Sequence, residues 1–111
     1  MNRAAHEGLA RVYEAMGPST YYDALMERTS LILLYPSNSR YHVAAARLLE
    51  KAGYLPAALA HYRRALDIND SVEEHGMQFT DKERLGLRAD VARLRAIVEE
   101  GAGPAPPAAS P

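Results

Sequence analysis

The side chains of this chain that could do chemistry are histidines, neighbouring carboxylates and serines. The four histidines are His6, His42, His61 and His75. They lack the close helical spacing with which two histidines share a metal ion in zinc proteases, so we expect no such site. The run Glu73-Glu74-His75, with Asp70, is the alternative: it could hold a cation loosely, although nothing in it fixes ligand geometry. We therefore expect no metal and no cofactor.

No nucleophile in the sequence has a recognisable catalytic neighbourhood. The serines fall in expected helix caps and turns, where local hydrogen bonding explains them: Ser19, Ser37, Ser39 and Ser71. The carboxylate pairs Glu73-Glu74 and Glu99-Glu100 are typical of solvated helix faces, and no glycine-rich phosphate loop follows a strand. The sequence therefore predicts a protein that is not an enzyme.

Composition narrows the class of protein and of partner. With 111 residues, 48% hydrophobic and 24% charged, the chain has the size and composition of one soluble domain. A net charge of −1 does not indicate binding to nucleic acid, and the absence of cysteine excludes disulfides. No apolar run approaches the length that crosses a bilayer, and residues 1–14 lack the apolar core of a secretory leader. We expect a cytoplasmic protein, with the periplasm as the alternative if it belongs to a longer membrane protein.

Two stretches of the chain repeat each other's pattern. In the first half of each stretch equivalent residues lie 36 positions apart, as Gly17 and Gly53 do. In the second half the offset is 34, as for Ala24 and Ala58, and Pro18-Ser19 supply the two extra residues. A period in this range predicts a helical solenoid, in which each helix pair buries its apolar face against its neighbours.

The repeat also decides how the histidines are interpreted. His6 and His42 occupy equivalent positions, which favours a packing role for both. His61 and His75 are expected to be exposed.

Apolar spacing and helix-ending residues predict five helices. Their ranges are about Arg3–Met16, Thr20–Tyr35, Ser39–Ala52, Leu55–Ile68 and Thr80–Glu99. We expect Ser19 or Thr20 to cap the second helix, with Asp23 three residues after Thr20, and residues 69–71 to end the fourth. The run Thr80-Asp81-Lys82-Glu83 has the form of a capping box.

These helices divide the chain into five segments. Residues 1–36 and 37–70 form two helix pairs, 71–79 connect them to the last helix, and 80–100 form that helix as a cap. Residues 101–111 are rich in proline and alanine without large apolar groups, so we expect a disordered tail.

The second helix pair resembles a tetratricopeptide repeat. It has the family's small, aromatic and turn residues at His42, Ala45, Ala46, Leu49, Gly53, Ala58, Tyr62, Ala65 and Asp70. The first pair is a degenerate match, with Arg28 at the aromatic position and Leu31 at a small-residue position. The resemblance implies an all-α fold of antiparallel helix pairs, a short right-handed α-solenoid of five helices in which the last helix caps the stack.

The resemblance also implies a function, a scaffold or adaptor that binds a partner protein or peptide. In this family the first helix of each pair lines a concave groove that holds the partner. Carried over position by position, the groove residues are Glu7, Arg11, Glu14, Arg40, Val43, Ala44, Arg47, Glu50 and Lys51. The equivalent pairs Arg11/Arg47 and Glu14/Glu50 predict a repeated ladder of arginine and glutamate, suited to a partner segment with an acidic group. The alternative is that these residues form salt bridges along the helix face, each contributing well under about 1 kcal/mol.

The Lys/Asn set with which the chaperone-binding branch of the family holds a terminal carboxylate is absent, because its positions carry Glu7, Arg11 and Ala44.

Two further hypotheses remain open at this point. Two repeats are few for a solenoid, so self-association is an alternative to a separate partner. The chain is also similar to helical-repeat tails of bacterial membrane proteins that assemble polysaccharides, so it could be a module or fragment of a larger protein.

Overall fold

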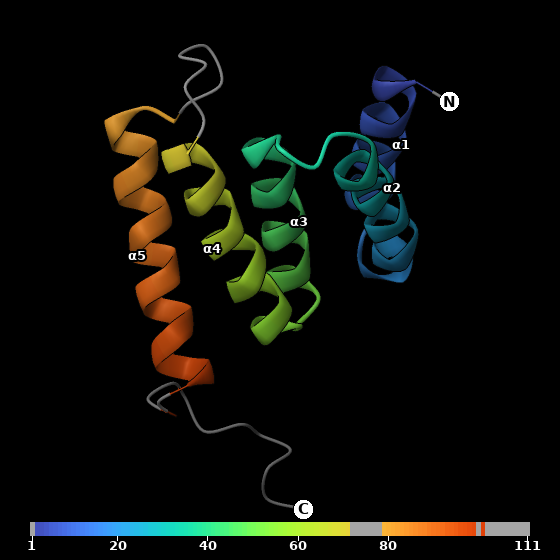
Figure 1. The fold of residues 1–111 in the computed structure, drawn as a ribbon. Helices are drawn as coiled ribbons and strands as arrows, with labels where there is room; N and C mark the ends of the chain where they lie inside the picture. Colours follow the sequence, from blue (N-terminus) through green and yellow to red (C-terminus); the bar gives the residue numbers. More distant parts are fainter. Residues whose placement is uncertain (1, 72–78, 100, 102–111) are drawn as a thin grey trace, which may run out of the picture.

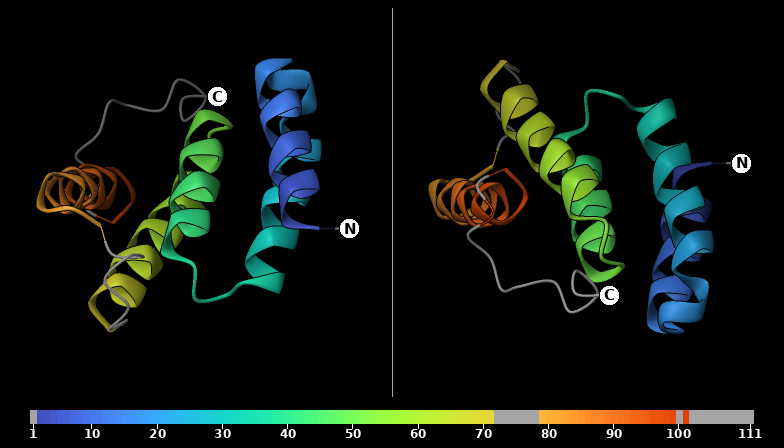
Figure 2. Two further views of the ribbon diagram at one scale, coloured as in Figure 1. Left: turned by 90° about the horizontal axis from the view of Figure 1, so that it is seen from above. Right: turned by 90° about the horizontal axis from the view of Figure 1, so that it is seen from below.

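The fold is a row of α-helices, each packed against the next in the chain. The computed structural model describes residues 2–71, 79–99 and 101, and these contain helices but no strand. The helices are α1 (Arg3–Ala15), α2 (Tyr21–Leu34), α3 (Ser39–Lys51), α4 (Leu55–Ser71) and α5 (Asp81–Val98), with a short 3-10 helix, η1 (Pro18–Thr20), between α1 and α2. The α3–α4 pair lies between the α1–α2 pair and α5 (Figures 1 and 2). The prediction of an all-α fold with five α-helices is confirmed for these residues.

Capping side chains explain where three of the helices begin. The Oδ1 atoms of Asn2 and Asn38 accept backbone N–H groups in the first turns of α1 and α3. At α5 the predicted capping box is present, because the Thr80 hydroxyl accepts the N–H of Glu83 while the Glu83 carboxylate accepts the N–H of Thr80.

Glycine ends the first helix of each pair, and the two turns then differ. Gly17 and Gly53 have φ angles of 102° and 90°, which favour glycine. After Gly53, the N–H of Tyr54 reaches back to the carbonyl of Leu49 at 2.9 Å. Proline at position 18 has no N–H with which to repeat this bond.

Thr20 lies at the N-cap position of α2, but its side chain makes no capping hydrogen bond, so the cap expected from Thr20 is not formed. Its hydroxyl instead donates back to the carbonyls of Tyr13 and Gly17. Tyr13 is the residue equivalent to Leu49, so the threonine supplies the donor that Pro18 lacks.

The predicted end of the fourth helix at Ile68 is also wrong, because α4 continues to Ser71. Asn69 lies on the buried side of this extension, where its Oδ1 accepts the N–H of Phe79 at 2.6 Å. This bond joins the end of α4 to the residue before Thr80, the N-cap of α5. Residues 72–78 of the predicted connection, the cluster around His75, and the predicted tail beyond residue 101 lie outside the described residues.

The small residues expected between the helices of each pair are fully buried. Ala10 and Ala24 in the first pair, and Ala46 and Ala58 in the second, have no exposed surface. The core that surrounds the second set extends to α5 through Leu87 and Leu94. None of the helices in the described ranges combines the length and hydropathy needed to span a membrane.

Candidate functional site

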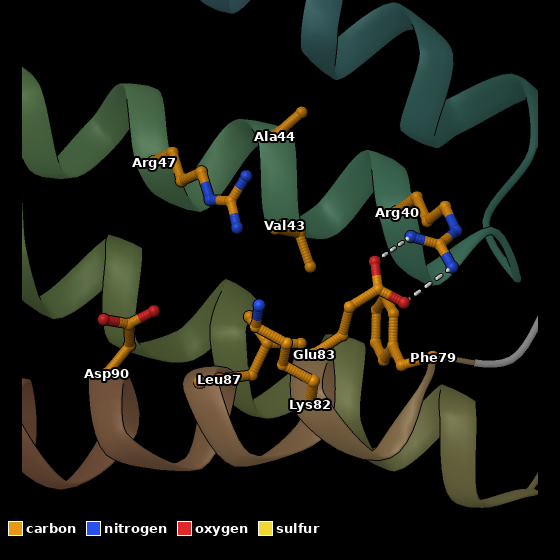
Figure 3. Close-up of a pocket in the computed structure, with 10 residues that line it drawn as sticks. Arg40, Val43, Ala44, Arg47, Phe79, Lys82, Glu83, Leu87 and Asp90 are labelled. Carbon is orange, nitrogen blue, oxygen red and sulfur yellow. Dashed lines mark hydrogen bonds and ion pairs between the residues drawn. The ribbon is translucent and has the colours of Figure 1, made fainter.

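A hollow between α3 and α5 brings predicted groove residues together with residues of the last helix. Its cavity volume is about 410 Å³. From α3 it is lined by Arg40, Val43, Ala44 and Arg47, all of which were predicted as groove residues. The other side consists of Phe79 and the α5 residues Lys82, Glu83, Gly86, Leu87 and Asp90 (Figure 3). We call this hollow the α3–α5 groove.

The floor of the α3–α5 groove is apolar and its rim is charged. Val43, Leu87 and Phe79 are buried and belong to the hydrophobic core or its edge. At one end Arg40 forms a two-bond ion pair with Glu83, at 2.7 and 3.2 Å, and its guanidinium lies 5.0 Å from the centre of the Phe79 ring. The Arg40 guanidinium holds the pKa of Glu83 at about 2, so this carboxylate stays ionised at neutral pH.

Two other cations of the groove have no such partner. Arg47 and Lys82 form no ion pair or hydrogen bond of their side chains with any of the residues that the structure describes. Both side chains extend into the space between α3 and α5 in Figure 3. Asp90, an acidic residue that also lines the groove, bonds Arg93 at 3.2 Å. The groove therefore presents two available cations above an apolar floor.

A second, smaller hollow flanks α3 on the side of the first helix pair. Its volume is about 210 Å³, and Ala44 and Arg47 line both hollows. The predicted residues Glu14 and Lys51 line this second hollow, together with Arg28 and Leu48.

The remaining predicted groove residues, Glu7, Arg11 and Glu50, bond other side chains of the protein. The carboxylate of Glu7 accepts the hydroxyl of Tyr41 at 3.2 Å and lies 3.9 Å from Arg11, and neither Glu7 nor Arg11 lines a described hollow. Glu50 lies 2.6 Å from Arg93 of α5 and accepts the hydroxyl of Tyr62 at 3.1 Å.

The predicted ladder of arginine and glutamate is therefore not formed by pairs along one helix. Glu50 bonds Arg93, and Glu14 bonds Arg28 of α2 through two hydrogen bonds of 2.9 and 3.0 Å. Among the predicted groove residues that the structure describes, Glu7 and Arg11 are the one pair along a helix face, as the salt-bridge alternative expects.

The prediction that His61 is exposed is wrong. Its Nδ1 lies 3.0 Å from Nδ1 of His42, and the Nε2 of His42 lies 3.3 Å from the carbonyl of Pro36. Burial lowers the pKa of both histidines. Because one neutral ring donates to the other, the pair is a structural hydrogen bond between α3 and α4. No group of three or more metal-binding side chains occurs in the described part of the chain.

Sequence reasoning missed the α5 side of the groove because it treated the last helix as a cap alone. A signal was available in the helix caps Asn38 and Thr80. Counted from these caps, Lys82 has the position of Arg40 and Gly86 that of Ala44. Treating α5 as a further groove helix would have found both residues.

In comparisons with protein-family models, curated proteins and solved structures, nothing matches this chain.

Proposed function

We propose that the chain is a non-enzymatic interaction module of the tetratricopeptide type, which holds an extended segment of a partner protein in the α3–α5 groove. The observation that carries the proposal is the pair of cations, Arg47 and Lys82, that extend over the apolar floor without a described partner. Both side chains are exposed, so they are free to meet carboxylates of a partner, and charge complementarity favours an acidic segment in the groove.

The apolar floor adds a second requirement for the partner. Val43, Leu87 and Phe79 line the hollow although little of their surface is exposed, so a small aliphatic side chain can contact them there while carboxylates of the same segment reach the rim. A segment that alternates acidic and aliphatic residues meets both requirements. Arg40 contributes less to binding, because Glu83 already neutralises it.

Equivalent contacts in the two helix pairs support the repeat type. Ala10 and Ala46 are fully buried at equivalent positions, and so are Ala24 and Ala58. Gly17 and Gly53 both have positive φ angles at equivalent turns. A stack of such pairs leaves the faces of α3 and α5 side by side, which is where the groove lies.

The test is a fluorescence-anisotropy titration of the whole chain with a labelled twelve-residue peptide of alternating Glu and Leu. The double variant Arg47→Glu/Lys82→Glu is expected to bind at least about tenfold more weakly, a loss of about 1.4 kcal/mol. Arg88→Glu, an exposed change on α5 outside the groove, is the matched control and should bind as the parent does. Equal binding by the double variant, or no binding by the parent, would contradict the proposal.

A second candidate is favoured by the outer face of α1. Val12 is 54% exposed although its equivalent in the second pair, Leu48, is 2% exposed, because α2 covers that face of α3. A further helix on Val12 and Met16 would make this chain a module of a larger protein. An immunoblot of source-cell extract tests this: a band well above 12.2 kDa supports it, and a band at 12.2 kDa contradicts it.

A further inference from the structure

The helix α2 exposes a stripe of large apolar side chains along one of its faces. Tyr22, Met26 and Leu33 are 72%, 52% and 77% exposed. Together with the exposed Thr29 they follow spacings of four, three and four residues, which place all four side chains on one face of a helix. We call these four residues the α2 stripe.

The repeat fold does not require the α2 stripe. The equivalent positions of α4, 34 residues later, carry no large apolar side chain and are Pro56, Ala60, Arg63 and Asp67. Leu33 is also the most exposed large apolar side chain among the described residues. An exposed apolar stripe that the fold itself does not need is typical of a surface that binds a protein.

A hollow lies at the N-terminal end of the α2 stripe. Its volume is about 380 Å³, and its lining is largely aromatic and apolar, with Tyr22, Leu25 and Tyr54 among the lining residues. We call it the tyrosine hollow. Leu33 lies three helical turns after Tyr22, at a distance of about 16 Å along the helix. The same face of α2 therefore has an apolar hollow at one end and a projecting leucine at the other.

The α2 stripe is symmetric about the middle of its helix. Tyr22 and Leu33 are equally far from the midpoint, and so are Met26 and Thr29. When two copies of α2 lie antiparallel about a two-fold axis, Tyr22 of one copy therefore meets Leu33 of the other. Spacings of four and three residues form the seam of a coiled coil, in which the side chains of each helix fill holes in the other. Leu33 of each copy then enters the tyrosine hollow of the second copy.

Lys51 makes the two surfaces complementary in charge. It is exposed in the lining of the tyrosine hollow, and its ammonium group has no ion pair or hydrogen bond with the other residues that the structure describes. In the antiparallel arrangement it lies near the C-terminal end of α2 of the second copy, where the last turn has no basic residue. The carbonyl groups at a helix C-terminus carry a partial negative charge, which a cation stabilises.

The exposed area is sufficient for a dimer that dissociates on dilution. Tyr22, Met26, Leu33 and Tyr54 are each more than half exposed. Side chains of this size cover on the order of 150–200 Å² when they are fully buried, so these four supply roughly 400 Å² per copy. The rest of the hollow raises this toward about 600 Å² per copy, the low end of the range for specific interfaces.

We propose that two copies of this chain form a reversible dimer through α2. The two helices lie antiparallel about a two-fold axis, and Leu33 of each copy occupies the tyrosine hollow of the other. None of the residues of the α2 stripe lines the α3–α5 groove, so the dimer leaves both grooves open to a partner segment. The proposal is therefore independent of the function proposed for that groove.

Sedimentation equilibrium of the full chain tests the dimer. At about 200 μM the parent should have twice the chain mass of 12.2 kDa, and it should dissociate on dilution. Leu33→Glu places a carboxylate in the tyrosine hollow and should weaken dimerisation at least about tenfold. The matched control is Leu85→Glu, which changes a 70% exposed leucine of α5 outside the α2 stripe and should dimerise as the parent does.

Single-cysteine variants test the orientation, because the chain has no cysteine of its own. Under oxidising conditions a mixture of Tyr22→Cys and Leu33→Cys should form a mixed disulfide dimer, since these two positions meet across the axis. Each variant alone should remain uncrosslinked, because identical positions lie far apart in an antiparallel pair.

Three results would overturn the proposal. The first is a parent that stays monomeric, as it would if a different protein covered the α2 stripe. The second is a dimer that Leu33→Glu leaves intact. The third is that the mixture of cysteine variants crosslinks no better than either variant alone.

Discussion

The two helix pairs join their helices at equivalent positions, but with different chemical groups. In the α1–α2 pair, the Nδ1 atom of His6 lies 2.7 Å from the carboxylate of Glu27. In the α3–α4 pair, the equivalent residues are His42 and His61, whose rings bond each other at 3.0 Å. The position of the contact is the same, whereas a histidine and a carboxylate have been exchanged for two histidines.

A second contact repeats in the same way. Glu14 of α1 accepts two hydrogen bonds from Arg28 of α2, and the equivalent Glu50 of α3 accepts the hydroxyl of Tyr62 of α4. Arginine and tyrosine are both long side chains that end in a donor, so either can reach the glutamate across the helix pair. At these two contacts a position keeps its geometric role although its residue type differs between the two helix pairs.

The largest expected effect comes from the close approach of the helices in the second pair. Ala58→Arg places a long charged side chain where Ala58 has no exposed surface, and should reduce the free energy of unfolding by about 3 kcal/mol or more. Ala24→Arg, its equivalent in the first pair, should be comparably damaging. Urea unfolding measures both, with the exposed Ala60→Arg on α4 as the control. A variant at Ala58 or Ala24 as stable as the parent would show that the helix register is wrong.

The next effect concerns the arginine of the first pair. Arg28→Ala leaves Glu14 half-buried without its donor, and should cost about 1–2 kcal/mol of unfolding free energy. Arg28→Tyr copies the contact of the second pair and should recover at least half of that loss. Denaturant unfolding of the two variants compares them directly. If the tyrosine variant is no more stable than the alanine variant, the two contacts are not equivalent.

The histidine pair predicts that the stability of the second helix pair depends on pH. Burial lowers the pKa of His42, with Arg64 adding to the effect, and burial together with His42 lowers the pKa of His61. A histidine whose pKa is lowered by folding contributes stability that is fully present above its pKa in the unfolded chain, about 6.5. This stability is lost as the pH falls through its lower pKa in the folded protein. The melting temperature should therefore drop between pH 7 and pH 5.

His61→Glu sharpens this prediction because it copies the pair of His6 and Glu27 into the second helix pair. A carboxylate beside His42 favours the protonated ring, so the contribution should now be present at low pH and lost as the pH rises. Thermal melts at several pH values test the reversal. The same downward trend in parent and variant would contradict it.

The smallest expected effect is that of the bond between α3 and α5. Glu50 has a second partner, Arg93, which Glu14 does not have among the described residues. The Arg93 guanidinium lowers the pKa of Glu50, but the arginine is about half exposed, so water and salt screen the pair. Arg93→Gln should cost about 0.2–1 kcal/mol, and less in high salt. A cost that does not change with salt would indicate a packing role for Arg93 instead.

The sequence predicted the helices well because apolar spacing, glycine turns and capping residues are local signals. It placed all five helices, and the capping box of Thr80 and Glu83 is present. It failed where a side chain acts across the fold: Thr20 donates back to α1, and Asn69 lies in the buried bond to Phe79. Neither partner is visible in a local pattern.

The candidate site was predicted in part for the same reason. The repeat pattern located the α3 side of the groove, including Arg47, but gave no information on which charges the fold would neutralise. Glu50 and Glu14 were expected to bind a partner in the groove. Instead they form ion pairs with Arg93 and Arg28, which lie on other helices. Such pairings depend on tertiary contacts.

The most direct test of the account asks which helix pair binds the partner segment. Amide signals of the whole chain are followed by nuclear magnetic resonance while the Glu-Leu peptide is added. The account predicts shifts confined to residues 40–47 and 79–90, which line the α3–α5 groove. Shifts centred on Glu7 and Arg11 of α1, or no shifts at all, would contradict it.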